Sequence, residues 1–125
     1  MCFPHLDSAN LPHGWCAVTV VGEFDHEKGG HLVLDELKLI LEIPSGATYL
    51  IPSACITHHN TAVAKHETRF SFTQYTAGSI FRWVDHRFMN EPKFWSSLKE
   101  EEYVLEMKKQ KSRLEDGLKL LRIWK

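Results

Sequence analysis

The hydrophobic pattern of this chain changes once along its length, and that change limits the fold more than any other feature. Up to about Val84, short runs rich in β-branched and aromatic residues alternate with turn residues, which is typical of strands. From Asn90 onward there is no cluster of turn residues, and strong helix formers predominate. A chain of 125 residues can bury one core. We therefore expect a β-rich core over residues 1–88 and a helical segment over residues 89–125.

Six runs in the first region carry the strand pattern, and their spacing of about ten residues favours a barrel or a sandwich. In the third run, apolar residues at positions 37, 39, 41 and 43 alternate with their neighbours, as in a half-buried strand. The expected strands are residues 15–22, 31–34, 37–43, 48–51, 68–76 and 79–84.

The C-terminal region carries start signals for two helices. Asn90 is a good N-cap, with Pro92 in the first turn, and Ser97 with Glu100 forms a second capping box where the helix would break. An apolar stripe at three-four spacing follows. It either packs on the sheet or binds a partner protein. Its members are Tyr103, Met107, Gln110, Leu114, Leu118 and Leu121.

Composition excludes several classes of function. A formal net charge of -1 gives no overall attraction to nucleic acid or anionic membranes, so any such contact needs a local patch. The longest apolar run is interrupted by Asp35, Glu36 and Lys38, so we expect no membrane span. The first residues do not resemble a signal peptide, and three cysteines without CxxC spacing indicate reduced thiols. We expect an intracellular protein, nuclear or cytoplasmic.

The stretch "MCFPHLDSAN" places two metal-ligand types close together. His5 and Asp7 are two residues apart, so at a strand end their side chains point the same way and can meet one metal ion. A second histidine would complete the two-histidine, one-carboxylate set of mononuclear non-haem Fe(II) oxygenases. His58 and His59 follow a strand that we expect to end near Ile56, and side-chain alternation alone does not decide between them.

An arginine lies eleven residues beyond the first of these histidines, in the next strand. Arg69 and His58 can therefore reach into one barrel mouth. The planar guanidinium pairs bidentately with a carboxylate, which makes arginine suited to a dicarboxylate ligand. Ser71 faces the same way and can add a hydroxyl. The full order, His-x-Asp, then His, then Arg-x-Ser, is far more specific than any of its parts.

This order of motifs resembles the Fe(II)/2-oxoglutarate-dependent dioxygenases with a double-stranded β-helix fold. The segment "HLDSANLPHGWCAV" is similar to the His-x-Asp-x-x-Asn segment of the TET/JBP group, and residues 4–87 resemble basidiomycete fungal proteins of that type. The resemblance implies a mainly β, jelly-roll, cupin-like core followed by the C-terminal α-helical segment. Because that fold has a strand before His-x-Asp, we expect a core that is incomplete at the N-terminus, with an exposed sheet edge.

The resemblance also implies roles for individual residues. His5 and Asp7 would bind iron, and the family pattern of histidine, one residue, then asparagine selects His58 as the third ligand. The catalytic set would contain no residue beyond these ligands. The distal carboxylate of 2-oxoglutarate would bind the arginine with help from the serine, and the family asparagine would lie near the substrate. These last three residues are Arg69, Ser71 and Asn10.

The implied activity is hydroxylation of a C–H bond with Fe(II) and 2-oxoglutarate as cofactors. In the TET/JBP group the target is the methyl group of 5-methylcytosine or thymine, so the implied partner is DNA or RNA with a methylated pyrimidine, read as a flipped nucleotide. Arg82, Arg87 and Lys93 could meet phosphates. The alternatives are an inactive fragment, a non-enzymatic cupin-like module that binds a metal or small ligand, and an interaction protein that acts through its C-terminal helix.

Overall fold

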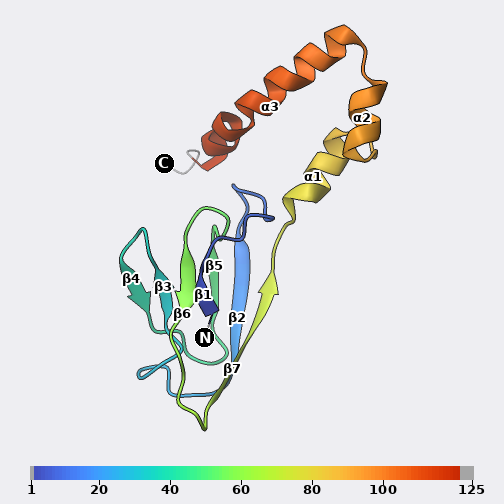
Figure 1. The fold of residues 1–125 in the computed structure, drawn as a ribbon. Coiled ribbons are helices and arrows are strands. Elements are labelled where there is room, and N and C mark those ends of the chain that lie inside the picture. Colours follow the sequence, from blue (N-terminus) through green and yellow to red (C-terminus); the bar gives the residue numbers. More distant parts are fainter. Residues whose placement is uncertain (1, 122–125) are drawn as a thin grey trace. The chain divides into compact units, whose positions relative to one another are not determined.

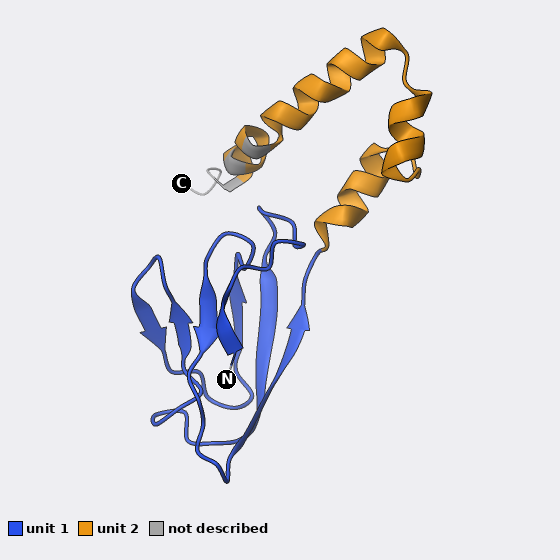
Figure 2. Ribbon diagram, viewed as in Figure 1, with its two compact units in different colours: residues 1–76 blue, residues 77–125 orange. Residues whose placement is uncertain are grey.

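The computed structural model describes residues 2–121, with the side chains of residues 114, 118 and 121 outside the described part. The chain divides into two compact units, residues 1–76 and 77–125 (Figure 2). Every strand of the described residues belongs to the first unit, and every helix belongs to the second.

The first unit contains seven strands in two antiparallel sheets (Figure 1). The four-stranded sheet has the order β1-β6-β3-β4, and the three-stranded sheet has the order β5-β2-β7. The strands are β1 (Cys2–His5), β2 (Cys16–Glu23), β3 (Leu32–Leu34), β4 (Leu39–Leu41), β5 (Thr48–Ile51), β6 (His58–Asn60) and β7 (Thr68–Gln74).

The core of this unit joins the inner faces of the two sheets. Along β2, alternate residues are buried, so Cys16, Val18 and Val20 point inward while their neighbours point out. Leu32 and Leu34 of β3 are buried in the same cluster as Cys16 and Val18. Each aliphatic side chain buried in this way contributes about 1.5–3 kcal/mol. The two sheets therefore pack against each other through a small aliphatic core.

The prediction of a mainly β, double-stranded β-helix (jelly-roll, cupin-like) core is wrong. The described residues form two separate open sheets with no closed barrel or jelly roll, and strands and helices hold roughly equal shares of the chain. Two of the expected strands also differ from the structure. The run 79–84 is helical, and the run 37–43 contributes only the short edge strand β4. Periodicity cannot separate a strand from a helix in apolar runs this short.

Local geometry explains both differences. The run 79–84 lies in α1 (Gly78–Asp85), where its apolar residues recur at helical as well as strand spacing. Lys38 has a φ of 53° and its amide N–H donates to the carbonyl of Asp35, so a left-handed turn occupies the start of the run 37–43. What remains is β4, whose residues are all exposed rather than half-buried.

Four expected strands are confirmed and two strands are new. Strands β2, β3, β5 and β7 lie within two residues of the expected bounds. Strands β1 and β6 were not expected, and the expected strand end near Ile56 is wrong, because β6 begins two residues later. Since β1 and β6 pair with each other, neither needs a strong pattern of its own.

The second unit contains α1, α2 (Glu91–Ser97) and α3 (Glu100–Leu121). The N-cap at Asn90 is confirmed, since its Oδ1 accepts the amide N–H of Lys93 at 3.1 Å. The break after Ser97 is confirmed as well, but the capping box is not. The Ser97 hydroxyl donates to the Phe94 carbonyl, and Glu102 instead accepts the amide N–H of Lys99 at 3.1 Å.

An aromatic cluster holds the second unit together. Phe94 is 1% exposed and stacks on His86 with ring centroids 4.1 Å apart. Trp95 lies edge-on to both Phe94 and Tyr103, which ties α2 to α3. Of the expected stripe on α3, Leu114, Leu118 and Leu121 have side chains outside the described part. Among the described residues, no helix combines the length and apolar character that a membrane span requires.

Candidate metal centre

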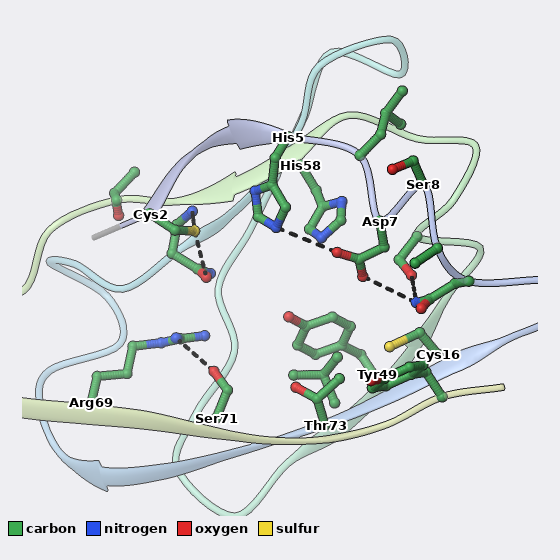
Figure 3. A pocket seen from close by; sticks show the side chains of 18 of the residues that line it. Cys2, His5, Asp7, Ser8, Cys16, Tyr49, His58, Arg69, Ser71 and Thr73 are labelled. Carbon is green, nitrogen blue, oxygen red and sulfur yellow. Dashed lines mark hydrogen bonds and ion pairs between the residues drawn. The ribbon is translucent and has the colours of Figure 1, made fainter. Parts of the chain in front are cut away.

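Two histidines that are far apart in the sequence of the first unit lie side by side. His5 ends β1 and His58 begins β6, and the two residues are directly opposite in the antiparallel ladder. Their ring centroids are 4.5 Å apart (Figure 3). Cys2 fastens the other end of the ladder, because its Sγ accepts the Asn60 amide N–H at 3.2 Å. Pairing of β1 with β6 therefore sets the distance between the two imidazoles.

Both imidazoles are held in the same tautomer. Nδ1 of His5 lies 2.8 Å from the carbonyl oxygen of Phe3, and Nδ1 of His58 lies 2.8 Å from that of Ile56. A carbonyl oxygen can only accept, so each Nδ1 carries the proton and donates it. In the neutral form of an imidazole held this way, Nε2 carries the lone pair, the form in which histidine binds metals.

Asp7 brings a carboxylate to the two imidazoles. One ligand atom from each of His5, Asp7 and His58 can be chosen so that all three lie within 4.8 Å of one another. Oδ1 of Asp7 is 3.6 Å from Nε2 of His5. These three side chains converge in Figure 3. The arrangement provides two nitrogens and one oxygen on one side of an ion and leaves its other positions open.

Asn10 and Ser53 hold the carboxylate in place. The Asn10 side-chain amide donates to Oδ2 of Asp7 at 3.3 Å and to Oγ of Ser53 at 3.0 Å. The Asp7 amide N–H donates to the Ser53 carbonyl at 3.0 Å. Ser53 itself is 1% exposed, so this support is rigid. Asn10, for which the family resemblance implies a place near the substrate, here contacts a candidate ligand.

His59 lies apart from this cluster. It is the next residue along β6, so its side chain points to the opposite face of the sheet. There its Nδ1 lies 3.5 Å from Oδ2 of Asp35. Of the two adjacent histidines, the structure brings His58 and not His59 to the candidate ligands.

Arg69 and Ser71 face the metal-ligand cluster from the other sheet. Both lie on β7, and with His5, Asp7 and His58 they line a cavity of about 720 Å³ between the two sheets (Figure 3). One terminal nitrogen of Arg69, Nη1, donates to Oγ of Ser71 at 3.2 Å. Nε and Nη2 are buried and have no hydrogen-bond partner among the described residues. Two N–H donor atoms of the Arg69 guanidinium, without hydrogen-bond partners among the described residues, thus lie in the cavity opposite His5, Asp7 and His58.

Gly30 makes room for this arginine. It has a φ of +71°, and a Cβ atom there would lie 2.8 Å from Cδ of Arg69 and 3.1 Å from the Phe24 ring. The guanidinium carbon lies 5.9 Å from the centroid of that ring. Glycine is required at this position both for its backbone conformation and for the space that the arginine stem occupies.

Cys16, Tyr49 and Ser53 are among the residues that line the cavity or support it and that the sequence analysis did not identify. Burial raises the pKa of the Cys16 thiol, and a hydrogen bond with Ser53 opposes this. Burial likewise raises the pKa of the Tyr49 hydroxyl, and Arg69 opposes this through its charge and through hydrogen bonding with the hydroxyl. Alternation along β2 and β5 already marks Cys16 and Tyr49 as inward-facing, whereas nothing in the local pattern marks Ser53.

Comparison with known proteins adds no assignment: no family model matches the sequence, and the search of curated proteins gives no match.

Proposed function

We propose that this chain is an Fe(II)- and 2-oxoglutarate-dependent dioxygenase that hydroxylates a C–H bond. The proposal depends on one observation. A cluster of two histidines and one carboxylate shares a cavity with an arginine whose Nε and Nη2 atoms are buried and have no hydrogen-bond partner among the described residues. The histidine and aspartate cluster suits a divalent metal ion, and the arginine suits a carboxylate. A metal ion together with a cosubstrate that carries a carboxylate would bind to both.

The donor set fits Fe(II). His5 and His58 each direct Nδ1 at a backbone carbonyl and leave Nε2 for a metal ion, and Asp7 presents a carboxylate oxygen. Two imidazoles and one carboxylate that leave several positions open are typical of non-haem Fe(II) oxygenases. A closed four-ligand structural zinc site would need one more protein ligand. Asn10 would steady Asp7, as outer hydrogen bonds do at most metal sites.

The arginine fits the distal carboxylate of 2-oxoglutarate. A buried polar group without a hydrogen-bond partner is costly, and a charged one more so. A carboxylate opposite Nε and Nη2 of Arg69 would remove that cost through a bidentate pair. Because Ser71 already accepts a hydrogen bond from Arg69, its own hydroxyl proton is free to donate to the same carboxylate.

Bound together, Fe(II) and 2-oxoglutarate supply the oxidising power that inserts one oxygen atom of O₂ into a C–H bond. The contribution of the chain is to hold and orient these groups. His5, His58 and Asp7 hold the metal, while Arg69 and Ser71 fix the far end of the cosubstrate across the cavity. Cys16 and Val18 of β2 form part of the wall of this space.

The proposed substrate is a methylated pyrimidine in DNA or RNA, with the methyl of 5-methylcytosine or thymine as the target. A base would have to leave its stack to reach a cavity between two sheets. Two of the residues expected to contact nucleic-acid phosphates form ion pairs within the chain: Arg82 with Glu91 at 3.8 Å, and Arg87 with Glu102 at 3.0 Å. We place the protein inside the cell, in the nucleus or cytoplasm, because its three cysteines are free thiols.

The test is turnover of 2-oxoglutarate to succinate by the purified full chain with Fe(II), ascorbate and DNA that contains 5-methylcytosine. His58→Ala and Arg69→Ala should each abolish succinate formation. His59→Ala is the matched control, since it removes the adjacent imidazole from the opposite face and should retain activity. Succinate formation that survives in His58→Ala would refute the proposed metal centre.

Two other outcomes would replace the proposal. Fe(II)-dependent binding of 2-oxoglutarate without succinate would make the chain a metal- and ligand-binding module. No binding of either would make it catalytically inactive. Equilibrium dialysis with labelled 2-oxoglutarate, in the presence and absence of Fe(II), separates these two results.

A further inference from the structure

One free sheet edge of the first unit is longer and more regular than the others. β7 is the last strand of the three-stranded sheet and pairs only with β2 among the described residues. It has seven residues, and its ladder with β2 runs from Gln74 to Thr68 without a register shift. A long, regular edge of this kind presents a row of unpaired backbone groups to another strand.

The other three free edges are protected. β1 contains Pro4, which cannot donate a backbone hydrogen bond. β4 has three residues and follows Lys38 in a left-handed turn. β5 has four residues and is followed directly by Pro52. Short strands, proline and lysine are the usual devices against edge pairing. β7 has none of these three, and its one charged residue, Arg69, points into the cavity.

The outer face of β7 is apolar. Phe70 is 63% exposed and Phe72 is 61% exposed, whereas Arg69, Ser71 and Thr73 line the cavity on the inner face. The outward positions of β7 carry no charge, and the formal net charge of the chain is -1, so little repulsion would keep two copies apart.

We propose that β7 pairs antiparallel with β7 of a second copy of this chain, about a two-fold axis at Ser71. This register makes the strand its own complement. Phe70 of each copy lies opposite Phe72 of the other, and Arg69 lies opposite Thr73 of the other. Aromatic cross-strand pairs stabilise antiparallel sheets, and the register places no like charges opposite each other. The dimer contains one continuous six-stranded sheet, and such an isologous contact closes on itself.

Self-pairing also affects the cavity described above. Arg69, Ser71 and Thr73 line both the cavity and the free edge, so the second copy extends the wall of the cavity beyond β7. The two candidate sites then lie beside a shared sheet. This inference does not depend on the proposed oxygenase activity.

The test is the mass of the full chain in solution, measured by sedimentation equilibrium over a range of concentrations. We expect twice the 14.5 kDa chain mass at high concentration. Phe70→Lys/Phe72→Lys places like charges opposite each other and should halve the mass. Phe70→Lys/Phe72→Glu places opposite charges across the same interface and should restore the dimer. A monomeric natural chain at every concentration, or a dimer that survives the double-lysine change, overturns the proposal.

Leu50→Lys is the matched control. Leu50 is 62% exposed on the same outer face, but it lies on β5 at the far side of the sheet from the β7 edge. Its substitution should leave the dimer intact. Higher oligomers that Leu50→Lys disperses would show that β7 pairs with β5 of another copy instead, and would overturn the two-fold arrangement.

Hydrogen exchange provides a second measurement on the natural chain, in case the lysine variants fail to fold. In a β7–β7 dimer, the amides of residues 68–74 that point away from β2 exchange slowly at high protein concentration and rapidly at low concentration. Equal exchange rates at both concentrations would contradict the proposal.

Discussion

His5 and His58 lie directly opposite each other in the β1–β6 ladder, with ring centroids 4.5 Å apart and both Nδ1 atoms directed at backbone carbonyls. Strand pairing thus brings two imidazoles to the carboxylate of Asp7, with one ligand atom of each residue within 4.8 Å of the others. Strand pairing sets the positions of the two imidazoles. Substitution of one side chain can therefore test a candidate ligand, or a residue that hydrogen-bonds to a ligand, by itself.

The first prediction compares the two adjacent histidines. His58→Ala removes a candidate ligand, whereas His59→Ala removes an imidazole on the opposite face of β6. We expect His58→Ala to weaken binding of Co(II), used as a spectroscopic probe, by more than about 100-fold, since loss of an outer partner alone costs 10–100-fold. His59→Ala should bind as the natural chain does. Equal affinities for both variants in an absorbance titration would rule out the site.

The second prediction concerns the support of Asp7. Asn10→Ala removes the donor to Oδ2 of Asp7 and to the buried Ser53 hydroxyl. We expect about 10–100-fold weaker Co(II) binding, as for other outer-shell partners. Ser8→Ala, at an exposed neighbouring position, should have no effect. If Asn10 acts only on the substrate, Asn10→Ala will leave metal affinity unchanged.

The third prediction concerns the space for Arg69. Gly30→Ala places a Cβ atom 2.8 Å from Cδ of the arginine and strains a φ of +71°. Gly46→Ala imposes a similar backbone strain, about 1–2 kcal/mol, at a φ of +87° with nothing within 4 Å. Calorimetry should show that only Gly30→Ala loses binding of 2-oxoglutarate while metal affinity is retained. Identical behaviour of the two variants would mean that the contact with Arg69 is irrelevant.

The fourth prediction is a pH dependence of stability. Amide N–H groups of Ala64 and Asp25 donate to the Glu67 carboxylate and lower its pKa. A lowered folded pKa stabilises fully above the unfolded value of about 4.3, and the effect is lost as pH falls through the folded pKa. Glu67→Gln should therefore reduce the thermal midpoint at pH 7 and show a smaller deficit near pH 3.

Glu27→Gln, at an exposed acidic residue near Asp25, is the control for that measurement. It should leave the midpoint unchanged at neutral pH. A deficit of Glu67→Gln that stays constant from pH 7 to pH 3 would contradict a role for the charged carboxylate.

The fifth prediction concerns the start of α2. Asn90→Ala leaves the amide N–H of Lys93 without its capping acceptor and should destabilise the second unit by about 1 kcal/mol. Asn90→Asp retains an acceptor and should cost far less. Urea unfolding followed by tryptophan fluorescence reports mainly on this unit, because three of the four tryptophans lie in residues 77–125. Equal midpoints for the two variants would show that the cap contributes nothing.

Much of the local structure could be predicted from the sequence. Strands β2, β5 and β7 have the period-two pattern and the expected bounds within two residues, and Asn90 caps α2 as expected. The same holds for side-chain direction over short distances. Arg69 and Ser71 share a face because they are two residues apart on one strand. Such features depend on backbone periodicity, which a short window of sequence contains.

The tertiary structure decided the rest. The choice between His58 and His59 follows from the register of β6 against β1, two strands whose own patterns are weak. Gly30 meets Arg69 from 39 positions away in the sequence. These outcomes depend on long-range pairing and packing. A one-residue change of register reverses every side chain, so local pattern alone could propose the ligands but could not bring them together.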